Sequence, residues 1–571
     1  KRQVQNNYVN GAPGTPTDEP WSPGPALGQR SLWLSGLRLA VIDLGSNSIR
    51  LLAVELVDEH TWKVLAEERA MTRLAQGLGR SGVLCAEAMA RSVEAVGRFK
   101  SIAEKFGVAG VRAFATAAVR EAENRADFLS LVHDRTGLKL DLVSELDEGK
   151  LTHRSVARVY DLGVGTGAVV DIGGGSLEVV YSQGGIITGN SSMPLGAVRV
   201  TEAFGGADEC SGARFKEMRR HIRKLITASV RKPEVPPTIM VGCGGTFTTL
   251  LTLGAAARGV MIERNSPALM TLGPVARPQL RSLIRELRGM TLEERLRVPG
   301  LPSDRADIVV AGLTVVDELM RHLGAAQINA HPGGVREGLI LRLIDEEVND
   351  RSRAGSRHPT SADLLRSVRE FASRCRYERA HSEHVAGLAL SIYDQFREES
   401  DLIPGLGTSP HERAILEAAA VLHDVGMMVE YRAHHKHGFT IIRHADLAGW
   451  SGHQVDLVAL VARYHRRSEP KARHPEFAAL NEHDRNLVRR LAAILRVADG
   501  LDRSHTQGVQ AARVRFGDRT VHLEVSTGRG DPTTDIQAAQ GKGGLLAGLL
   551  GVELGIMAVS AGVGSRPELE I

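Results

Sequence analysis

Two glycine-rich segments with a common pattern constrain the fold of this 571-residue chain most. They span 43–48 (DLGSNS) and 171–176 (DIGGGS), and each lies between two short apolar runs. That arrangement predicts a strand, a tight turn and a returning strand. Glycine lets the backbone approach an anion, so the N–H groups of each turn can point at phosphate oxygens. One such segment alone could equally be a plain hairpin turn, but the pair predicts two lobes that close on one phosphorylated substrate.

The order of predicted strands and helices divides the chain into several units. Strands alternate with helices over 37–160, and a similar pattern recurs over 161–346, so we expect two related α/β lobes. A polar stretch at 347–359 is predicted to be a linker. Helical periodicity continues over 360–506, and alternating strands in 507–571 predict a small C-terminal α/β unit.

The composition is that of an ordinary soluble protein. Apolar residues make up 43% and charged residues 24%, and 71 basic against 67 acidic residues give a net charge of +4. This balance requires no nucleic-acid partner. Residues 1–36 are rich in Pro, Gly, Asn and Thr and are predicted to be a disordered tail. The four cysteines form no CxxC pair, and no long apolar run lacks charges, so we expect a cytoplasmic protein without membrane spans.

Several further motifs resemble those of the exopolyphosphatase/guanosine pentaphosphate phosphohydrolase family. Beside the two glycine-rich segments, they lie at 115–122 (ATAAVREA), 194–199 (PLGAVR), 242–246 (GCGGT) and 336–338 (REG). The resemblance covers nearly the whole chain. It implies two actin-like, sugar-kinase-like (ribonuclease H-like) lobes. It also implies hydrolysis of terminal phosphates from polyphosphate or guanosine pentaphosphate with Mg²⁺, and a homodimer.

Phosphate groups are expected to be held by three glycine turns and by arginines. Cleavage of a phosphoanhydride needs in-line positioning and neutralised oxygens more than covalent chemistry. Backbone amides, short polar side chains and bidentate guanidinium groups supply this. The candidates are Gly45, Ser46, Asn47, Ser48, Arg73, Arg120, Gly173, Gly174, Gly175, Ser176, Gly244, Gly245 and Thr246. Arg73 could alternatively be a solvated surface residue.

Carboxylates are the expected metal ligands. The candidates for Mg²⁺ or for a metal-bound water are Asp43, Asp141, Glu148 and Asp171. Magnesium keeps several waters and takes one or two carboxylates directly, so we do not expect all four to bind it.

Glu121 and Glu148 compete for the role of general base. Glu148 matches the acidic motif of the family at 144–149 (SELDEG), in which Glu145 replaces a glycine and Leu146 an acid. Glu121 could alternatively be a carboxylate near a helix start, where the macrodipole favours it.

The predicted helical unit contains a second constellation, which resembles the signature of HD-type phosphohydrolases. Its members are His381, His423, Asp424 and Asp499. Imidazoles and carboxylates from three helices can meet one divalent ion in the core of a bundle. His437 and His465 lie where binuclear HD enzymes place extra ligands. The alternative is a vestigial domain whose histidines form hydrogen bonds, or line a basic polyphosphate path with 434–437 and 463–467.

The leading functional hypothesis is an exopolyphosphatase that releases orthophosphate along a long basic passage between the lobes and the helical unit. A guanosine pentaphosphate phosphohydrolase would use the same turns, so the sequence does not separate the two. A sensor that binds alarmones or polyphosphate without turnover is a third hypothesis, supported by the altered acidic motif. A sugar or acetate kinase is disfavoured, because 116–121 and 171–176 match the phosphatase branch better.

Overall fold

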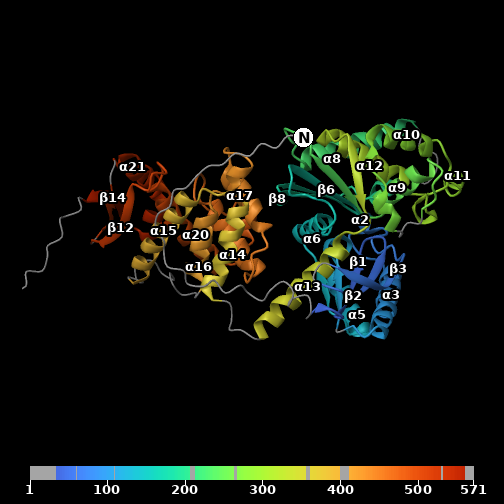
Figure 1. Ribbon diagram of the computed structural model, residues 1–571, viewed down its shortest axis with the longest axis horizontal. Coiled ribbons are helices and arrows are strands. Elements are labelled where there is room, and N and C mark those ends of the chain that lie inside the picture. Colours follow the sequence, from blue (N-terminus) through green and yellow to red (C-terminus); the bar gives the residue numbers. More distant parts are fainter. Residues whose placement is uncertain are drawn as a thin grey trace, which may run out of the picture.

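The computed structural model describes residues 34–58, 61–108, 110–205, 212–262, 267–354, 360–398, 411–517, 519–528 and 531–559. Almost all of the predicted N-terminal tail and the second part of the predicted linker lie outside these residues. Figure 1 shows the two lobes at one end of the molecule, a bundle of helices in the middle, and a small sheet at the other end.

Lobe I is built on a five-stranded mixed sheet in the order β3-β2-β1-β4-β5. The first three strands are antiparallel hairpin neighbours, and β4 and β5 run parallel to β1. Its strands are β1 (Arg38–Leu44), β2 (Ile49–Leu56), β3 (Trp62–Ala70), β4 (Val111–Ala115) and β5 (Leu140–Leu142). Its helices are α2 (Leu78–Ser81), α3 (Ala86–Lys105), α4 (Ala117–Glu121), α5 (Arg125–Thr136) and α6 (Glu145–Ala157).

Lobe II repeats this topology. Its sheet has the order β10-β11-β9-β6-β7-β8, so β8-β7-β6-β9-β11 corresponds to the five strands of lobe I. The strands are β6 (Thr166–Ile172), β7 (Leu177–Gln183), β8 (Ile186–Met193), β9 (Ile239–Cys243), β10 (Val275–Ala276) and β11 (Gln327–His331). The helices are α7 (Ala197–Phe204), α8 (Gly212–Ser229), α9 (Gly245–Ala256), η1 (Pro267–Thr271), α10 (Arg277–Arg288), α11 (Leu292–Arg295), η2 (Ser303–Arg305) and α12 (Val309–Leu323).

Helix α13 (Val335–Ala354) returns from lobe II to lobe I. Its residues Leu339, Ile340, Leu343 and Ile344 pack in one buried cluster with Leu39 and Val41 of β1 and Leu52 and Val54 of β2. We expected 161–346 to form lobe II and 347–359 to form a linker. The helix instead completes the core of lobe I and continues through Ala354, because Glu and Arg are good helix formers and a polar stretch can extend a helix.

The helical domain packs around α20 (Glu482–Gly500), which is buried along most of its length. The other helices are α14 (Ser361–Arg374), α15 (Arg379–Glu398), α16 (Glu412–Leu422), η3 (Val425–Met428), α17 (His434–Arg443), α18 (Gly452–Arg463) and α19 (Pro475–Ala478). The helix that bears each predicted metal ligand is apolar around it, so the polar side chains project from buried helices.

The C-terminal unit is a three-stranded sheet in the order β12-β13-β14, with two helices. Its elements are β12 (Val509–Phe516), β13 (Thr520–Thr527), α21 (Thr533–Lys542), α22 (Gly544–Leu550) and β14 (Glu553–Val559). Leu523 and Val525 share one hydrophobic cluster with α15 and α20, so this unit is part of the core of the helical domain. Within the described residues, no helix is both long enough and apolar enough to cross a membrane.

Candidate active site

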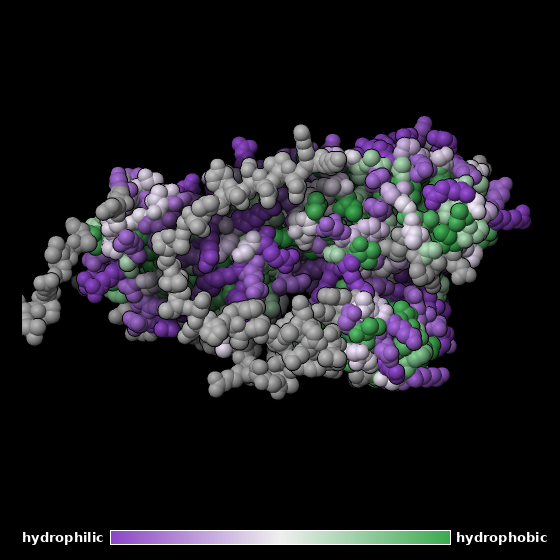
Figure 2. Space-filling model, in the orientation of Figure 1, coloured by the Kyte–Doolittle hydropathy of each residue, from purple (hydrophilic) through white to green (hydrophobic). Residues whose placement is uncertain are grey.

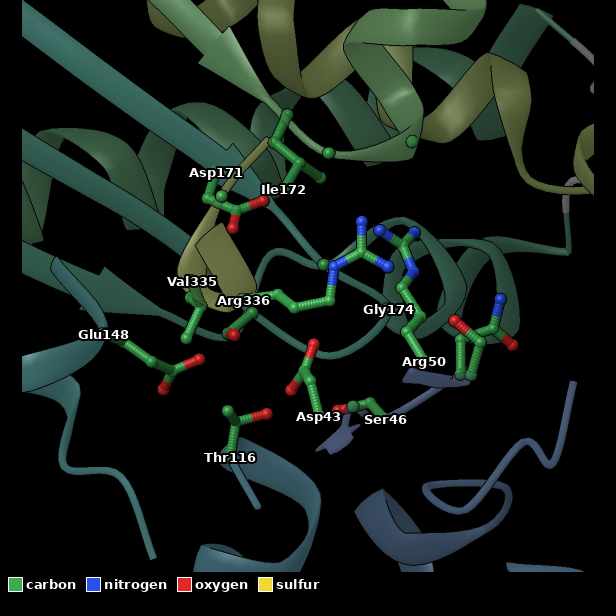
Figure 3. Close-up of a pocket in the computed structure, with 18 of the residues that line it drawn as sticks. Asp43, Ser46, Arg50, Thr116, Glu148, Asp171, Ile172, Gly174, Val335 and Arg336 are labelled. Carbon is green, nitrogen blue, oxygen red and sulfur yellow. The ribbon is translucent and has the colours of Figure 1, made fainter. Parts of the chain in front are cut away.

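The two glycine turns, one from each lobe, face each other where the lobes meet. Both turns close with the same hydrogen bond: Gly45 N–H donates to the Ser48 carbonyl at 3.2 Å, and Gly173 N–H to the Ser176 carbonyl at 3.0 Å. A Cβ added at Gly174 would lie only 3.1 Å from Cβ of Asn47. The turns therefore touch, and a cavity of about 120 Å³ lies between the lobes at this point (Figure 3).

The structure gathers most of the predicted site residues around this cavity. Those that line it are Asp43, Gly45, Ser46, Asn47, Ser48, Glu148, Asp171, Gly173, Gly174, Ser176, Gly244 and Gly245. Gly244 has φ +84°, and a Cβ there would lie 2.9 Å from Asp171 Oδ1. The third glycine turn thus lets the backbone approach a carboxylate, which no other residue type allows without strain.

Arg120 and Glu121 lie on the short helix α4, outside the cavity lining. Arg120 donates to Glu148 Oε2 at 2.9 Å and to the Val143 carbonyl at 2.7 Å, so its guanidinium positions a carboxylate rather than facing the cavity. Glu121 accepts a hydrogen bond from Arg199 of lobe II at 2.7 Å, and its side chain is 42% exposed. This ion pair joins the two lobes.

Four other candidates also lie outside the cavity lining. Arg73 is half exposed and forms an ion pair with Asp307 of lobe II at 3.6 Å. Asp141 lies on β5 at the edge of the sheet, 3.7 Å from Lys139. Gly175 packs against Ser46, and Thr246 is buried in the first turn of α9.

Buried carboxyl groups dominate the electrostatics of the cavity. Burial, opposed by Arg50 and aided by the neighbouring Asp43, raises the pKa of Asp171 to about 7. Burial also raises the pKa of Glu148 to about 7, against the lowering effect of Arg120. The pKa of Asp43 is raised for the same reason. Several carboxylates held close together in a buried site repel one another, so a bound cation would stabilise their charged forms.

Sequence reasoning missed several residues that line the cavity, among them Arg50 and Glu178. Each lies directly opposite an aspartate across a hairpin: Asp43 pairs with Arg50, and Asp171 pairs with Glu178. Directly paired residues point to the same face of a sheet. The predicted hairpins therefore contained the signal, because counting across each turn places a second charged residue beside each aspartate.

Two further lining residues, Arg336 and Glu337, come from the start of α13. Glu337 accepts a hydrogen bond from Gly334 N–H at 2.6 Å, and Arg336 donates to Glu337 at 2.8 Å and to Glu67 of β3 at 2.7 Å. Figure 3 shows the Arg336 and Arg50 side chains extending toward one another beside Asp43 and Asp171. The sequence motif placed these residues at the end of lobe II but gave no sign that they face the cavity.

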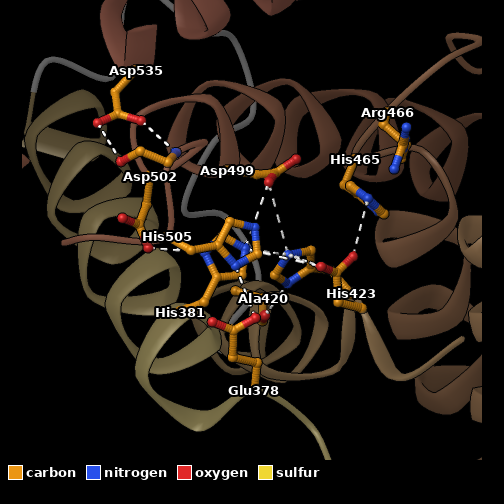
Figure 4. A network of polar contacts seen from close by, with 12 residues as sticks. Glu378, His381, Ala420, His423, His465, Arg466, Asp499, Asp502, His505 and Asp535 are labelled. Carbon is orange, nitrogen blue, oxygen red and sulfur yellow. Dashed lines mark hydrogen bonds and ion pairs between the residues drawn. The ribbon is translucent and has the colours of Figure 1, made fainter. Parts of the chain in front are cut away.

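The helical domain brings its predicted ligands together at a second place (Figure 4). His381 Nε2 and His423 Nε2 are 3.2 Å apart. Asp424 Oδ2 lies 3.6 Å from His423 Nε2, and Asp499 Oδ1 lies 3.8 Å from His381 Nε2. The four residues come from α15, the end of α16 and α20.

Of the two extra histidines, His465 joins this cluster and His437 does not. His465 Nε2 is 3.6 Å from Asp424 Oδ1, whereas His437 faces Glu430 at 3.8 Å. His434, at the first position of α17, takes the expected place of His437, with Nε2 3.0 Å from Asp424 Oδ1. The start of α17 lies beside η3, so the first histidine of the helix reaches the aspartate.

Comparison with known families agrees with this arrangement of lobes and turns. The model of the Ppx/GppA phosphatase family matches residues 53–347, and that of Ppx/GppA phosphatase domain III matches 365–530. The chain belongs to the Ppx/GppA phosphatase family. The first model spans most of the two mixed sheets, and the second spans the helical domain and the first two strands of the small C-terminal sheet.

Curated relatives of this Ppx/GppA chain have two different names. It is 34% identical over 315 residues to "Exopolyphosphatase 1" of Mycobacterium leprae, covering 55% of this chain and 91% of that protein. It is 27% identical over 459 residues to "Guanosine-5'-triphosphate,3'-diphosphate pyrophosphatase" of Pseudoalteromonas translucida, covering 80% of this chain and 86% of that protein. A solved Ppx/GppA structure from Aquifex aeolicus has a TM-score of 0.48 and 27% identity, covering 55% of this chain and 98% of its own.

Proposed function

We propose that this Ppx/GppA protein is an exopolyphosphatase, which hydrolyses the terminal phosphoanhydride bond of inorganic polyphosphate and releases orthophosphate. One observation carries the proposal: two glycine turns from opposite lobes meet at a cavity that also holds Asp43, Glu148 and Asp171. The backbone amides of both turns can bind the terminal phosphate from two sides, which fixes it for in-line attack.

The donor set of the cavity fits a divalent cation of the Mg²⁺ kind. Asp43, Glu148 and Asp171 offer carboxylate oxygens, which are the ligands that Mg²⁺ prefers, and burial raises the pKa of all three, so a bound cation would stabilise their charged forms. When bound there, Mg²⁺ supplies positive charge to the phosphate oxygens. Arg50 lines the same cavity and can contribute a second positive charge to the phosphate.

Glu148 is the proposed general base. Arg120 donates to its Oε2, which leaves Oε1 to accept the proton of a water that attacks the terminal phosphorus. A base with a pKa of about 7 is well matched to neutral pH. Glu121 is the weaker candidate, because its carboxylate lies outside the cavity and pairs with Arg199.

Guanosine pentaphosphate phosphohydrolase is the second candidate function. Of the two curated relatives, the "Guanosine-5'-triphosphate,3'-diphosphate pyrophosphatase" matches the longer part of this chain, over 459 residues. In addition, a cavity of about 570 Å³ adjoins the first and shares Arg50, Gly244 and Arg336 with it, which gives room for the rest of a nucleotide.

The groove between the lobes and the helical domain also bears on the substrate. It has a volume of about 1390 Å³ and is lined by residues of α6, α13, α17 and α18. Among its described residues, five are basic (Lys150, Arg154, Arg158, Arg342 and Arg443) and five are acidic (Asp147, Asp345, Glu346, Asp446 and Asp456). The hydrophilic surface around it (Figure 2) is therefore balanced in charge, in contrast to the basic passage that we expected for polyphosphate.

Substrate comparison tests these alternatives. Orthophosphate release is measured with the full chain and Mg²⁺, on long-chain polyphosphate and on guanosine pentaphosphate in parallel. Faster release from polyphosphate supports the leading proposal, and faster release from the nucleotide supports the second. Tight binding of either substrate without any release supports the sensor hypothesis and rules out both enzymes.

We also propose that the helical region is an HD-type domain in which His381, His423, Asp424 and Asp499 hold one divalent ion. The spacing of their ring nitrogens and carboxylate oxygens supports this. We also propose a cytoplasmic location and a homodimer. Light scattering coupled to gel filtration tests the dimer, since a mass of one 61.5 kDa chain would exclude it.

A further inference from the structure

Four buried histidines of the helical domain have their Nδ1 atoms against oxygen atoms that can only accept hydrogen bonds. The pairs are His381 Nδ1 with Asp502 Oδ2 at 2.9 Å, His423 Nδ1 with the Ala420 carbonyl at 2.6 Å, His434 Nδ1 with the Tyr431 carbonyl at 3.1 Å, and His465 Nδ1 with the Ala462 carbonyl at 2.6 Å. Nδ1 therefore carries the proton in each ring, and a neutral ring then has its lone pair on Nε2.

The four Nε2 atoms converge in two pairs. His381 Nε2 faces His423 Nε2 at 3.2 Å, and His434 Nε2 faces His465 Nε2 at 3.3 Å. Asp424 lies between the pairs, with Oδ2 toward the first and Oδ1 toward the second. Acceptor groups at these distances repel one another unless a proton or a cation lies between them.

Burial keeps water from resolving this conflict. The four histidines are at most 1% exposed, and Asp424 is 9% exposed. Arg466 brings a positive charge to the second pair: its Nη1 lies 3.1 Å from His434 Nε2 and 3.3 Å from His434 Nδ1, so it contacts the ring without choosing between the two nitrogens. A divalent ion between His434 and His465 would interact with the ring nitrogens more strongly than the Arg466 guanidinium does.

We propose that the helical domain holds two divalent transition-metal ions, bridged by the Asp424 carboxylate. The first ion takes His381, His423, Asp424 Oδ2 and Asp499; the second takes His434, His465 and Asp424 Oδ1. The ligand atoms of His381, His423 and Asp424 all lie within 4.8 Å of one another, and so do those of Asp424, His434 and His465. Imidazole with carboxylate suits Zn²⁺, Fe²⁺ or Mn²⁺ better than Mg²⁺.

Residues that contact the proposed ligands hold them in position, as is usual around metal sites in proteins. Asp502, which is fully buried, accepts from His381 and from Gln507 N–H at 2.7 Å, so it holds the His381 ring in place. Lys542 of α21 forms an ion pair with Asp499 Oδ2, which leaves Oδ1 directed at His381 and His423. This contact also joins the C-terminal unit to α20.

Metal counting tests the proposal on the full-length protein. The protein is loaded with Mn²⁺, passed through gel filtration in buffer with excess Mg²⁺ to clear the cleft between the lobes, and measured by mass spectrometry. We expect two Mn²⁺ per chain in the parent, one in His434→Gln and in His465→Gln, and none in Asp424→Ala. An electron paramagnetic resonance spectrum of two coupled ions should appear in the parent and be absent in His465→Gln.

His437→Gln is the matched control, because His437 lies on the same helix as His434 but faces Glu430. It should retain two ions. Circular dichroism establishes that each variant is folded. One ion per chain in the parent, or two ions in both His434→Gln and His465→Gln, would overturn the bridged pair while leaving the single-ion HD proposal intact. No ion in the parent would remove both and would mean that protons separate the facing rings. None of these metal counts depends on phosphate release at the cleft between the lobes.

Discussion

Replacing Gly244 by alanine should both strain the backbone and displace a carboxylate of the active site, and a second glycine variant distinguishes the two effects. Gly244 has φ +84° and ψ −172°, a backbone region that is essentially restricted to glycine, so alanine is disfavoured there by about 1–3 kcal/mol and Tm should fall by several degrees. The added Cβ would also lie 2.9 Å from Asp171 Oδ1, against at least 3.4 Å for an ordinary contact. The carboxylate must therefore move by about 0.5 Å. Because a 1 Å error in a catalytic geometry can cost about 10²-fold, we expect kcat/KM to fall by roughly 10-fold.

Gly259→Ala is the matched control for this prediction. Gly259 has φ +78°, but a Cβ there would have no neighbour within 4 Å. Both variants should lose stability in thermal melts, Gly244→Ala the more, and at a temperature where both are folded only Gly244→Ala should lose activity in an orthophosphate-release assay. Equal activity of the two variants, with both folded at the assay temperature, would refute the view that Asp171 acts from its observed position.

Three further predictions concern the same cleft. Arg50→Ala should lower kcat/KM by about 10- to 100-fold, the loss expected for a hydrogen bond to a charged group, and unchanged steady-state kinetics would exclude a phosphate contact. Glu121→Gln should leave kcat nearly unchanged, because its partner Arg199 shares an exposed pair of little energetic weight; a 100-fold loss would instead make Glu121 the base. Burial raises the pKa of Glu148 and Asp171 to about 7, so the folded protein retains protons that the unfolded chain has lost. The protonated carboxyl groups stabilise the folded state fully below about pH 4, and this stabilisation is lost as the pH rises to about 7. Tm of the metal-free protein should therefore fall from about pH 4 to about pH 7, and added Mg²⁺ should raise it again. A Tm that rises over this range without metal would contradict the raised pKa of the two carboxyl groups.

The parts of the fold that depend on local sequence could be predicted. Each glycine turn and its flanking strands are set within about twenty residues, so the hairpins at 43–48 and 171–176 followed from the sequence. Residues brought together by long connections could not be predicted in the same way. Helix α13 returns to lobe I from the end of lobe II, and no local pattern marks that crossing.

The candidate site shows the same division. Asp43 and Asp171 lie at the ends of predicted strands and meet in the cavity as the repeat suggested. Asp141 lies in the middle of β5, but β5 is the edge strand of its sheet, and the order of strands is not visible in the sequence. Arg120 matched a family motif, yet it faces Glu148 because α4 is a short helix whose direction depends on packing.

The histidine cluster was predicted in composition but not in full detail. His437 and His434 are three positions apart, so both lie near one face of α17, and periodicity cannot distinguish them. Only the contact of the helix start with η3 selects His434.

Orthophosphate release by Glu148→Gln tests the proposed chemistry of the cleft most directly. Glutamine has the same shape and can still accept from Arg120, so substrate affinity should remain. Loss of a general base costs about 10²- to 10⁴-fold in rate, and we expect kcat to fall by that factor on the preferred substrate. Glu145→Gln, on the exposed start of α6, should keep the parental rate. A Glu148→Gln variant that releases phosphate as fast as the parent would contradict the account.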